Sequence, residues 1–273
     1  MEFHPVKTVS EYEQFIENNS MGSDDILDHA KGNIALKGLC EVCGGETFFV
    51  VDNTFNHLSL DVTRKTNRLY YRETFHCQRC GLNNRMRAAM AFLQRLQLGK
   101  IYITEHQGRF FQLLQARYAD AQGSEYFPDV PLGSSRAGIR SEDCTKLTFS
   151  EASFNSVISQ DVLEHVEHYP AALREFYRVL KPDGHFICSV PSVLHSWGHW
   201  ERVKTLQGRL HYFCPPEYHG DPIASSGSLC YRYFGMSFLK DMLGAGFRDA
   251  TCYLYNDLPT GHFGIGSIFL AQK

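Results

Sequence analysis

The sequence predicts an α/β protein in which a doubly wound, mainly parallel sheet ends in an antiparallel hairpin and follows a small cysteine-bearing N-terminal domain. Two observations carry this prediction. Strands and helices alternate from residue 100 onward, and four cysteines stand in two closely spaced pairs before that point. At 273 residues the chain is long enough for one such domain with a small appendage. Its 43% of apolar and 21% of charged residues are typical of a globular protein.

Several other classes of protein are not expected. No apolar run approaches the roughly 18–20 residues that a membrane-spanning helix needs. The first residues lack a basic start followed by an apolar stretch, so no secretory signal is expected. The nine cysteines are odd in number, which argues against a disulfide framework and favours a reducing, cytoplasmic location.

The N-terminal third divides into two parts. Residues 1–33 predict an acidic helical segment with a short amphipathic helix over 9–19. Residues 34–82 hold the cysteine pairs, each a CxxC followed by glycine, with strands expected at 47–51 and 72–76. Two residues between thiolates let one tight turn present both sulfurs to a tetrahedral ion, and two turns complete a closed site. This region therefore predicts a zinc ribbon, with a structural zinc ion held by Cys40, Cys43, Cys77 and Cys80.

Residues 83–273 carry the alternating elements. A helix is expected to start with Asn83 or Asn84 as N-cap and to end at Gly99. The further elements follow from apolar periodicity. They are strands at 101–104, 156–159 and 185–190, a strand that ends near 123–126, a short strand centred on 138–140, two final strands near 251–255 and 265–271, helices at 109–118 and 171–180, and a helix that includes 238–243. Residues 181–184 are expected to break the helix before them. The stretch 192–235 is too long for an ordinary connection and predicts a binding insertion, rich in His, Trp and Tyr.

The charges are unevenly distributed. The net charge is −3, but residues 64–100 hold nine basic residues against Glu73 alone. Such an excess suits an anionic ligand or RNA. The plainer interpretation is a solvated face, since the arginines of the expected helix lie off its apolar stripe.

Three segments together resemble the class I S-adenosylmethionine (SAM)-dependent methyltransferases of the type 11 kind. They read EDCTKLTF at 142–149, SFNSVISQDVLEHV at 153–166 and RVLKPDGHFICSVP at 178–191. The resemblance covers residues 100–273 and implies a Rossmann-like methyltransferase domain over 83–273. The ribbon and the segment PPEYHGDP at 215–222 are similar to a bacterial subgroup of these enzymes.

The resemblance implies SAM as cofactor and assigns its contacts. Glu125, at the end of the second strand, would accept from both ribose hydroxyls, as a carboxylate can. Asp143 would accept from the adenine amino group, and the backbone N–H of Cys144 would face an adenine ring nitrogen. Gln160 and Asp161 would line the methionine side. The usual glycine-rich turn after the first strand is replaced by residues 104–109, where Glu105 and Gly108 would serve.

The function expected is SAM-dependent O-methylation of a small molecule or of a sugar or glycan precursor. His165 is the first candidate for the general base, and His219 with Asp221 is the second. Asp161 and Glu164 could also face a magnesium ion, but packing and capping explain such a pattern more often, and magnesium is not among the expected cofactors. Two alternatives stay open. One is an RNA methyltransferase that grips RNA with the ribbon and residues 64–100, which the overall acidity disfavours. The other is a binding protein with an inactive methyltransferase domain.

Overall fold

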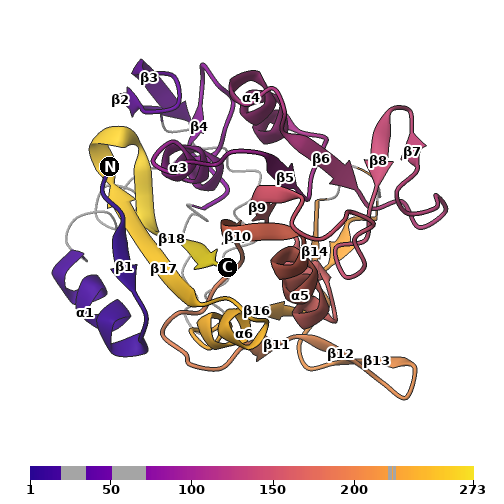
Figure 1. Cartoon of the computed structure of the whole chain (residues 1–273). Helices are drawn as coiled ribbons and strands as arrows, with labels where there is room; N and C mark the ends of the chain where they lie inside the picture. Colours follow the sequence, from indigo (N-terminus) through magenta and orange to yellow (C-terminus); the bar gives the residue numbers. More distant parts are fainter. Residues whose placement is uncertain (20–34, 51–71, 221–222, 224–225) are drawn as a thin grey trace. The chain divides into compact units, whose positions relative to one another are not determined.

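The computed structural model describes residues 1–19, 35–50, 72–220, 223 and 226–273 (Figure 1). The chain divides into two compact units. One unit comprises Met1–Pro5, Glu13–Gln97 and Tyr253–Ser267. The other comprises Val6–Tyr12, Leu98–Cys252 and Ile268–Lys273. The division differs from the expected boundary at residue 83, because the helix after the cysteine pairs groups with the cysteine-bearing unit.

The described residues form one large sheet with the strand order β1-β17-β18-β10-β9-β5-β6-β8-β7. The strands are β1 (His4–Val6), β5 (Ile101–Ile103), β6 (Gln122–Glu125), β7 (Ser135–Arg136), β8 (Ile139–Ser141), β9 (Phe154–Gln160), β10 (Leu180–Ser189), β17 (Asp249–Asp257) and β18 (His262–Gln272). From β8 to β10 all neighbours are parallel, whereas β18 pairs antiparallel with β10. This order confirms the predicted Rossmann-like α/β sheet with its terminal hairpin.

Helices α4 (Arg109–Arg117), α5 (Tyr169–Val179) and α6 (Phe238–Gly244) accompany this sheet (Figure 1). The amphipathic helix α5 buries Tyr169, Ala172, Leu173, Phe176 and Val179, at the spacing of one helix face. Strands β9 and β10 have buried interiors, as strands covered on both faces must. Helix α5 ends at Val179, before residues 181–184, as expected; these residues lie within β10, where the register shifts between Leu180 and His185.

The insertion 192–235 contains three small two-stranded antiparallel pairs. They are β11 (Trp200–Glu201) with β16 (Arg232–Tyr233), β12 (Val203–Leu206) with β13 (Arg209–Tyr212), and β14 (Tyr218–His219) with β15 (Ser228–Leu229). Some of its apolar side chains are core: Cys230, Tyr233 and Phe234 are buried. Others are exposed, namely Trp197, Trp200, Tyr212, Phe213 and Tyr218. The insertion is thus part core and part surface.

The cysteine-bearing unit contains a three-stranded sheet, β2 (Ala35–Cys40), β3 (Gly45–Val50) and β4 (His76–Cys77). Helix α3 (Asn84–Leu93) follows, and its N-cap Asn83 accepts from the backbone N–H of Met86 at 2.8 Å, as predicted. The helix ends at Leu93, not at Gly99, because the chain tightens into short turns after that residue. Helix α1 spans Val9–Asn19, the range expected.

Two arginines of α3 do not belong to a solvated face. Arg87 is 1% exposed and donates to the backbone oxygens of Thr260, Gly261 and Phe75. Arg85 pairs with Glu73 at 2.7 Å. The plain interpretation of residues 64–100 is therefore wrong for these two arginines. Arg64, Lys65 and Arg68 lie outside the described residues.

In the part of the chain that the structure describes, no helix is long and apolar enough to cross a membrane.

Candidate functional site

The parallel strands reverse their order between β5 and β9, and this switch point locates the candidate site. In chain order the five parallel strands run third, second, first, fourth and fifth across the sheet. Ligands of open α/β sheets bind outside the carboxyl ends of the strands at such a reversal. The loops that leave this edge are Thr104–Gly108 after β5 and Gln160–His165 after β9.

The carboxylate of Glu125 holds the loop after β5. Its Oε1 atom accepts from the backbone N–H groups of His106 and Gln107, at 2.8 and 2.7 Å. Glu125 is 9% exposed, so these charged hydrogen bonds lie in a protected position. The predicted cofactor residue thus ends β6 as expected, and it also shapes the neighbouring turn.

Two glycines permit the backbone conformation of the turn after β5. Gly108 has φ +108°, a conformation that L side chains rarely adopt, and nothing lies within 4 Å of the place where a Cβ would stand. On the adjacent strand, a Cβ on Gly123 would lie 2.4 Å from the backbone oxygen of Glu105. Gly123 therefore lets the two strands' ends approach closely. The sequence alone did not predict this role of Gly123, although a glycine two residues before the acid that ends β6 is a signal for it.

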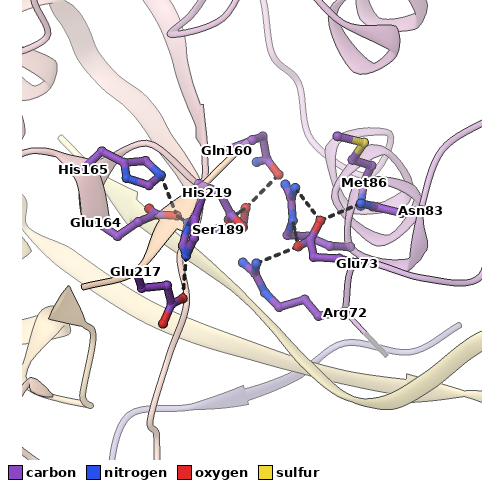
Figure 2. Close-up of polar contacts among 12 residues, drawn as sticks. Arg72, Glu73, Asn83, Met86, Gln160, Glu164, His165, Ser189, Glu217 and His219 are labelled. Carbon is purple, nitrogen blue, oxygen red and sulfur yellow. Dashed lines mark hydrogen bonds and ion pairs between the residues drawn. The ribbon is translucent and has the colours of Figure 1, made fainter. Parts of the chain in front are cut away.

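Some buried polar atoms at this edge have no hydrogen-bond partner among the described residues, and two of them are nitrogens. They are Nδ1 of His106, in the loop after β5, and Nε2 of Gln160, at the end of β9. The Oε1 atom of Gln160 accepts from the hydroxyl of Ser189 at 3.0 Å (Figure 2). Since buried polar groups are nearly always hydrogen-bonded, these atoms fit a bound polar molecule such as SAM.

A surface pocket of about 370 Å³ lies beside the ends of β6 and β8. Its lining is Tyr126, Phe127, Pro128, Asp129, Val130, Pro131, Leu132 and Asp143. Asp143 accepts from the backbone N–H and the hydroxyl of Thr145, and Cys144 follows it directly. A volume of this size and a lining of aromatic, apolar and carboxylate groups suit a planar heterocycle.

Asp161 begins the loop after β9 in a left-handed conformation, with φ +54°. The hydroxyl of Ser189 donates to its carboxylate at 2.7 Å, and its backbone N–H donates to the Ser189 carbonyl at 3.0 Å. A non-glycine residue held in this conformation costs free energy and persists only where its surroundings enforce it. Such residues cluster at functional sites, and this one stands at the switch point.

A cluster of acids and histidines follows on the same loop. Nε2 of His165 lies 3.7 Å from Oε1 of Glu164, and Nδ1 of His219 lies 3.6 Å from the same oxygen. Figure 2 shows these side chains together with Glu217, whose Oε1 lies 2.8 Å from Nε2 of His219. The structure therefore brings both predicted histidines to one place. Asp221, the third predicted catalytic residue, lies outside the described residues.

The environment of His219 favours its charged form. Burial alone would lower the pKa of this imidazole. The nearby Cys230, Glu164 and Glu217 outweigh burial and raise the pKa to about 12. The pKa of Glu217 is lowered, against the effect of burial, by its contacts with His219, Tyr233 and Arg202. His219 thus carries a proton near neutral pH unless another cation replaces it.

The four paired cysteines also converge. The sulfurs of Cys40 and Cys80 lie 4.0 Å apart, and those of Cys43 and Cys77 lie 3.7 Å apart. All four ligand atoms lie within 4.8 Å of one another. Burial and the neighbouring Cys40 raise the pKa of the Cys43 thiol to about 11, so this thiol resists ionising beside Cys40 in the absence of a cation.

A family model described as a methyltransferase domain matches residues 106–188. No curated protein sequence matches the chain. Three solved structures are similar. An S-adenosylmethionine-dependent methyltransferase from Mesorhizobium loti is 17% identical, with a TM-score of 0.42 over 68% of this chain and 96% of that one. The 1,6-didemethyltoxoflavin-N1-methyltransferase of Burkholderia thailandensis, with bound 1,6-didemethyltoxoflavin and S-adenosylhomocysteine, is 18% identical, with a TM-score of 0.41 over 69% and 77%. A putative S-adenosylmethionine-dependent methyltransferase from Listeria monocytogenes is 13% identical, with a TM-score of 0.42 over 69% and 98%.

The matched methyltransferase domain lies on the strands and loops that form the switch point. Together with the doubly wound sheet, it defines the class of protein: a class I methyltransferase fold. The chain is an enzyme, a methyltransferase.

Proposed function

We propose that this enzyme transfers the methyl group of SAM to an oxygen atom of a small molecule or of a sugar precursor, and that a structural zinc ion holds the cysteine-bearing unit together. The observation that supports oxygen as the acceptor atom is the histidine cluster at the carboxyl end of β9. Methyl transfer to a hydroxyl needs a group that takes its proton, whereas a softer nucleophile does not.

The cofactor contacts follow from the switch-point geometry. Glu125 would hold the ribose as well as the loop after β5. Asp143 and the backbone of Cys144 would meet the adenine in the pocket beside Tyr126. The unpartnered nitrogen of Gln160, with Asp161, Glu105 and Gly108, would face the methionine end. When bound, SAM supplies an electrophilic sulfonium methyl group, and this chain's part is to align the acceptor with it and exclude water.

His165 is the proposed base. The carbonyl of Leu229 can only accept, so the 2.9 Å contact with Nδ1 of His165 places a proton on that nitrogen. The neutral ring then carries its lone pair on Nε2, which can take the acceptor's proton. His219, and Asp221 with it, belong to the same acceptor side in this proposal.

Exposed aromatic side chains favour a ring-shaped acceptor. Trp197, Trp200 and Tyr218 are 55%, 37% and 51% exposed in the insertion. Aromatic faces of this kind stack on sugars and planar rings. The RNA alternative has less support, because the described arginines Arg85 and Arg87 are engaged inside the protein.

The zinc proposal rests on sulfur spacing. In a tetrahedral site with Zn–S bonds of about 2.3 Å, neighbouring sulfurs lie about 3.8 Å apart. The observed 3.7 and 4.0 Å bracket that value.

A labelled-methyl transfer assay tests the function. The purified chain is incubated with SAM and with nucleotide sugars, hydroxylated small molecules or an RNA oligonucleotide, and S-adenosylhomocysteine is measured. On the acceptor that turns over, His165→Ala should lower kcat by about 100-fold or more and leave the SAM dissociation constant unchanged. His211→Ala, an exposed histidine of the same insertion, is the control. Turnover confined to RNA would favour the RNA enzyme, and a chain that binds no SAM by calorimetry would favour the inactive binding protein.

A further inference from the structure

Three potential ligand atoms point into one small space beside the end of β9. Oε1 of Glu164 lies 3.7 Å from Nε2 of His165 and 3.6 Å from Nδ1 of His219, and all three atoms lie within 4.8 Å of one another. An ion with bonds of about 2.0–2.1 Å to nitrogen and oxygen separates neighbouring tetrahedral ligands by about 3.3 Å. The observed spacing needs only small side-chain adjustments to reach that geometry.

The outward nitrogen of each imidazole is already engaged. Nδ1 of His165 lies 2.9 Å from the carbonyl of Leu229, and Nε2 of His219 lies 2.8 Å from the carboxylate of Glu217. Histidines that bind metals nearly always donate their other N–H to a carbonyl or a carboxylate, which fixes the tautomer and orients the ring. Here both histidines have that arrangement, and the nitrogens left over are the two that face Glu164.

Of the three potential ligands, the carboxylate of Glu164 has the most unusual environment. It is 0% exposed, and neither oxygen has a hydrogen-bond partner among the described residues. An ionised carboxylate out of water, facing a lone pair of His165, is costly unless a cation lies between them. That cation is either a proton on an imidazole or a metal ion.

We propose that Glu164, His165 and His219 bind one divalent transition-metal ion, through Oε1, Nε2 and Nδ1. Two imidazoles and one carboxylate suit Zn²⁺ and related first-row ions better than Mg²⁺ or Ca²⁺, which prefer oxygen ligands alone. The zinc of the cysteine cluster would be a separate ion, since its ligands are four thiols of the other unit.

The proposed site is open on one side. His165 and His219 keep 17% and 22% of their side-chain surface exposed, while Glu164 closes the inner side. Three protein ligands with a vacant position are typical of catalytic rather than structural metal sites. A second group, Glu217, His219 and Cys230, also clusters. It is less suited, because Glu217 is engaged by Arg202, Tyr233 and His219.

An ion at this place would change how the acceptor is activated. An acceptor hydroxyl bound at the open position would lose its proton to solvent on the exposed side more readily, as metal-bound water does. His165 would then be a ligand rather than the base. This consequence rests on the proposed O-methylation, whereas the metal site itself does not.

Metal stoichiometry on the full chain tests the inference. After removal of bound metal, the wild-type protein is dialysed against Co²⁺ at equilibrium and the bound cobalt per chain is measured. We expect two ions per chain, and one in His165→Ala. His211→Ala, an exposed histidine on β13, is the matched control and should keep two. Glu217→Gln, which removes the charged partner of His219, should weaken the second site by about 10- to 100-fold.

Absorption identifies which ligands hold each ion. In Cys40→Ser, the remaining cobalt should show visible d–d bands without a sulfur-to-metal charge-transfer band, because the proposed ligands include no thiolate. A single ion per wild-type chain that shows the sulfur-to-metal charge-transfer band would overturn the proposal and leave a protonated His219 as the cation beside Glu164. A charge-transfer band lost in Cys230→Ser would also overturn it, in favour of the Cys230 group. Unchanged stoichiometry in a folded His165→Ala variant would exclude this site as well.

Discussion

At the scale of single residues, the carboxylate of Glu125 has two structural features that matter for the site. It ends β6 at the edge where ligands bind, and its Oε1 fixes the backbone of His106 and Gln107. A carboxylate that shapes the turn after β5 supplies part of what a glycine-rich turn supplies in other proteins of this resemblance. The turn therefore keeps its conformation with one glycine, Gly108, within it. The adjacent Gly123 has no side chain that would collide with the backbone of Glu105.

Glu125→Ala should weaken SAM binding by roughly 10- to more than 100-fold. The loss of charged hydrogen bonds costs about 1.5–3 kcal/mol, and the loop after β5 also loses its anchor. Isothermal titration calorimetry measures the change. Asp120→Ala, an exposed acid of the same unit, is the control and should bind SAM as the wild type does. An unchanged dissociation constant in Glu125→Ala would show that the ribose lies elsewhere.

At the level of elements, helix α3 and strand β18 are joined by a buried polar network. The Nδ1–H of His262 donates to the side-chain oxygen of Asn84 at 2.7 Å, and Asn84 donates to the carbonyl of Phe263 at 2.7 Å. Arg87, one turn further along α3, bonds the carbonyls of Thr260 and Gly261. Burial, and then the charge of Arg87, lower the pKa of His262 well below its ordinary value. The folded protein therefore keeps this imidazole neutral.

This network predicts a pH dependence of stability. The ordinary histidine pKa is 6.5. Below that pH the unfolded chain binds a proton at His262 that the folded chain does not. The free energy of unfolding should then decrease as the pH falls from 6.5 to 5, by at most about 1.4 kcal/mol per pH unit from this group. Urea unfolding of the wild type and of His262→Gln between pH 5 and 7.5 measures it. The free energy of unfolding should depend less steeply on pH in the glutamine variant than in the wild type, because the other histidines contribute equally in the two proteins. Equal slopes in the two proteins would contradict the prediction.

On the scale of the whole molecule, the two compact units should depend on metal differently. The unit with β2, β3 and β4 has a small sheet, and its four cysteine sulfurs meet where a cation would unite them. Small domains of this kind often fold only with their metal. The unit with the parallel strands has its own buried interior in β9, β10 and α5.

Cys40→Ser should therefore release zinc and make the cysteine-bearing unit susceptible to proteolysis, while SAM affinity changes by less than about threefold. Native mass spectrometry counts the zinc, limited proteolysis locates the cut sites, and calorimetry reports SAM binding. Cys214→Ser is the control, because Cys214 stands apart from the paired cysteines. Protein purified without chelator that holds no zinc would contradict the prediction, as would equal loss of both units.

The sequence by itself determined the features that local patterns carry. Helix α1, the N-cap Asn83 and the strands β9 and β10 follow from apolar spacing and capping chemistry over a few residues. The acid at the end of β6 and the convergence of the cysteine pairs follow from motif spacing in the same way.

Only the tertiary structure decided the features that depend on residues far apart in the chain. Strand β18 inserts between β10 and β17, which no local period specifies. Arg87 is buried because backbone carbonyls from residues 260 and 261 meet it, although its helical position alone suggested solvent. His219 reaches Glu164 across 55 residues because the insertion folds back onto the loop after β9, where the backbone N–H of Tyr231 donates to the Glu164 carbonyl. Periodicity records which face of an element is apolar, but the partner of each face and of each buried charge is chosen by long-range packing.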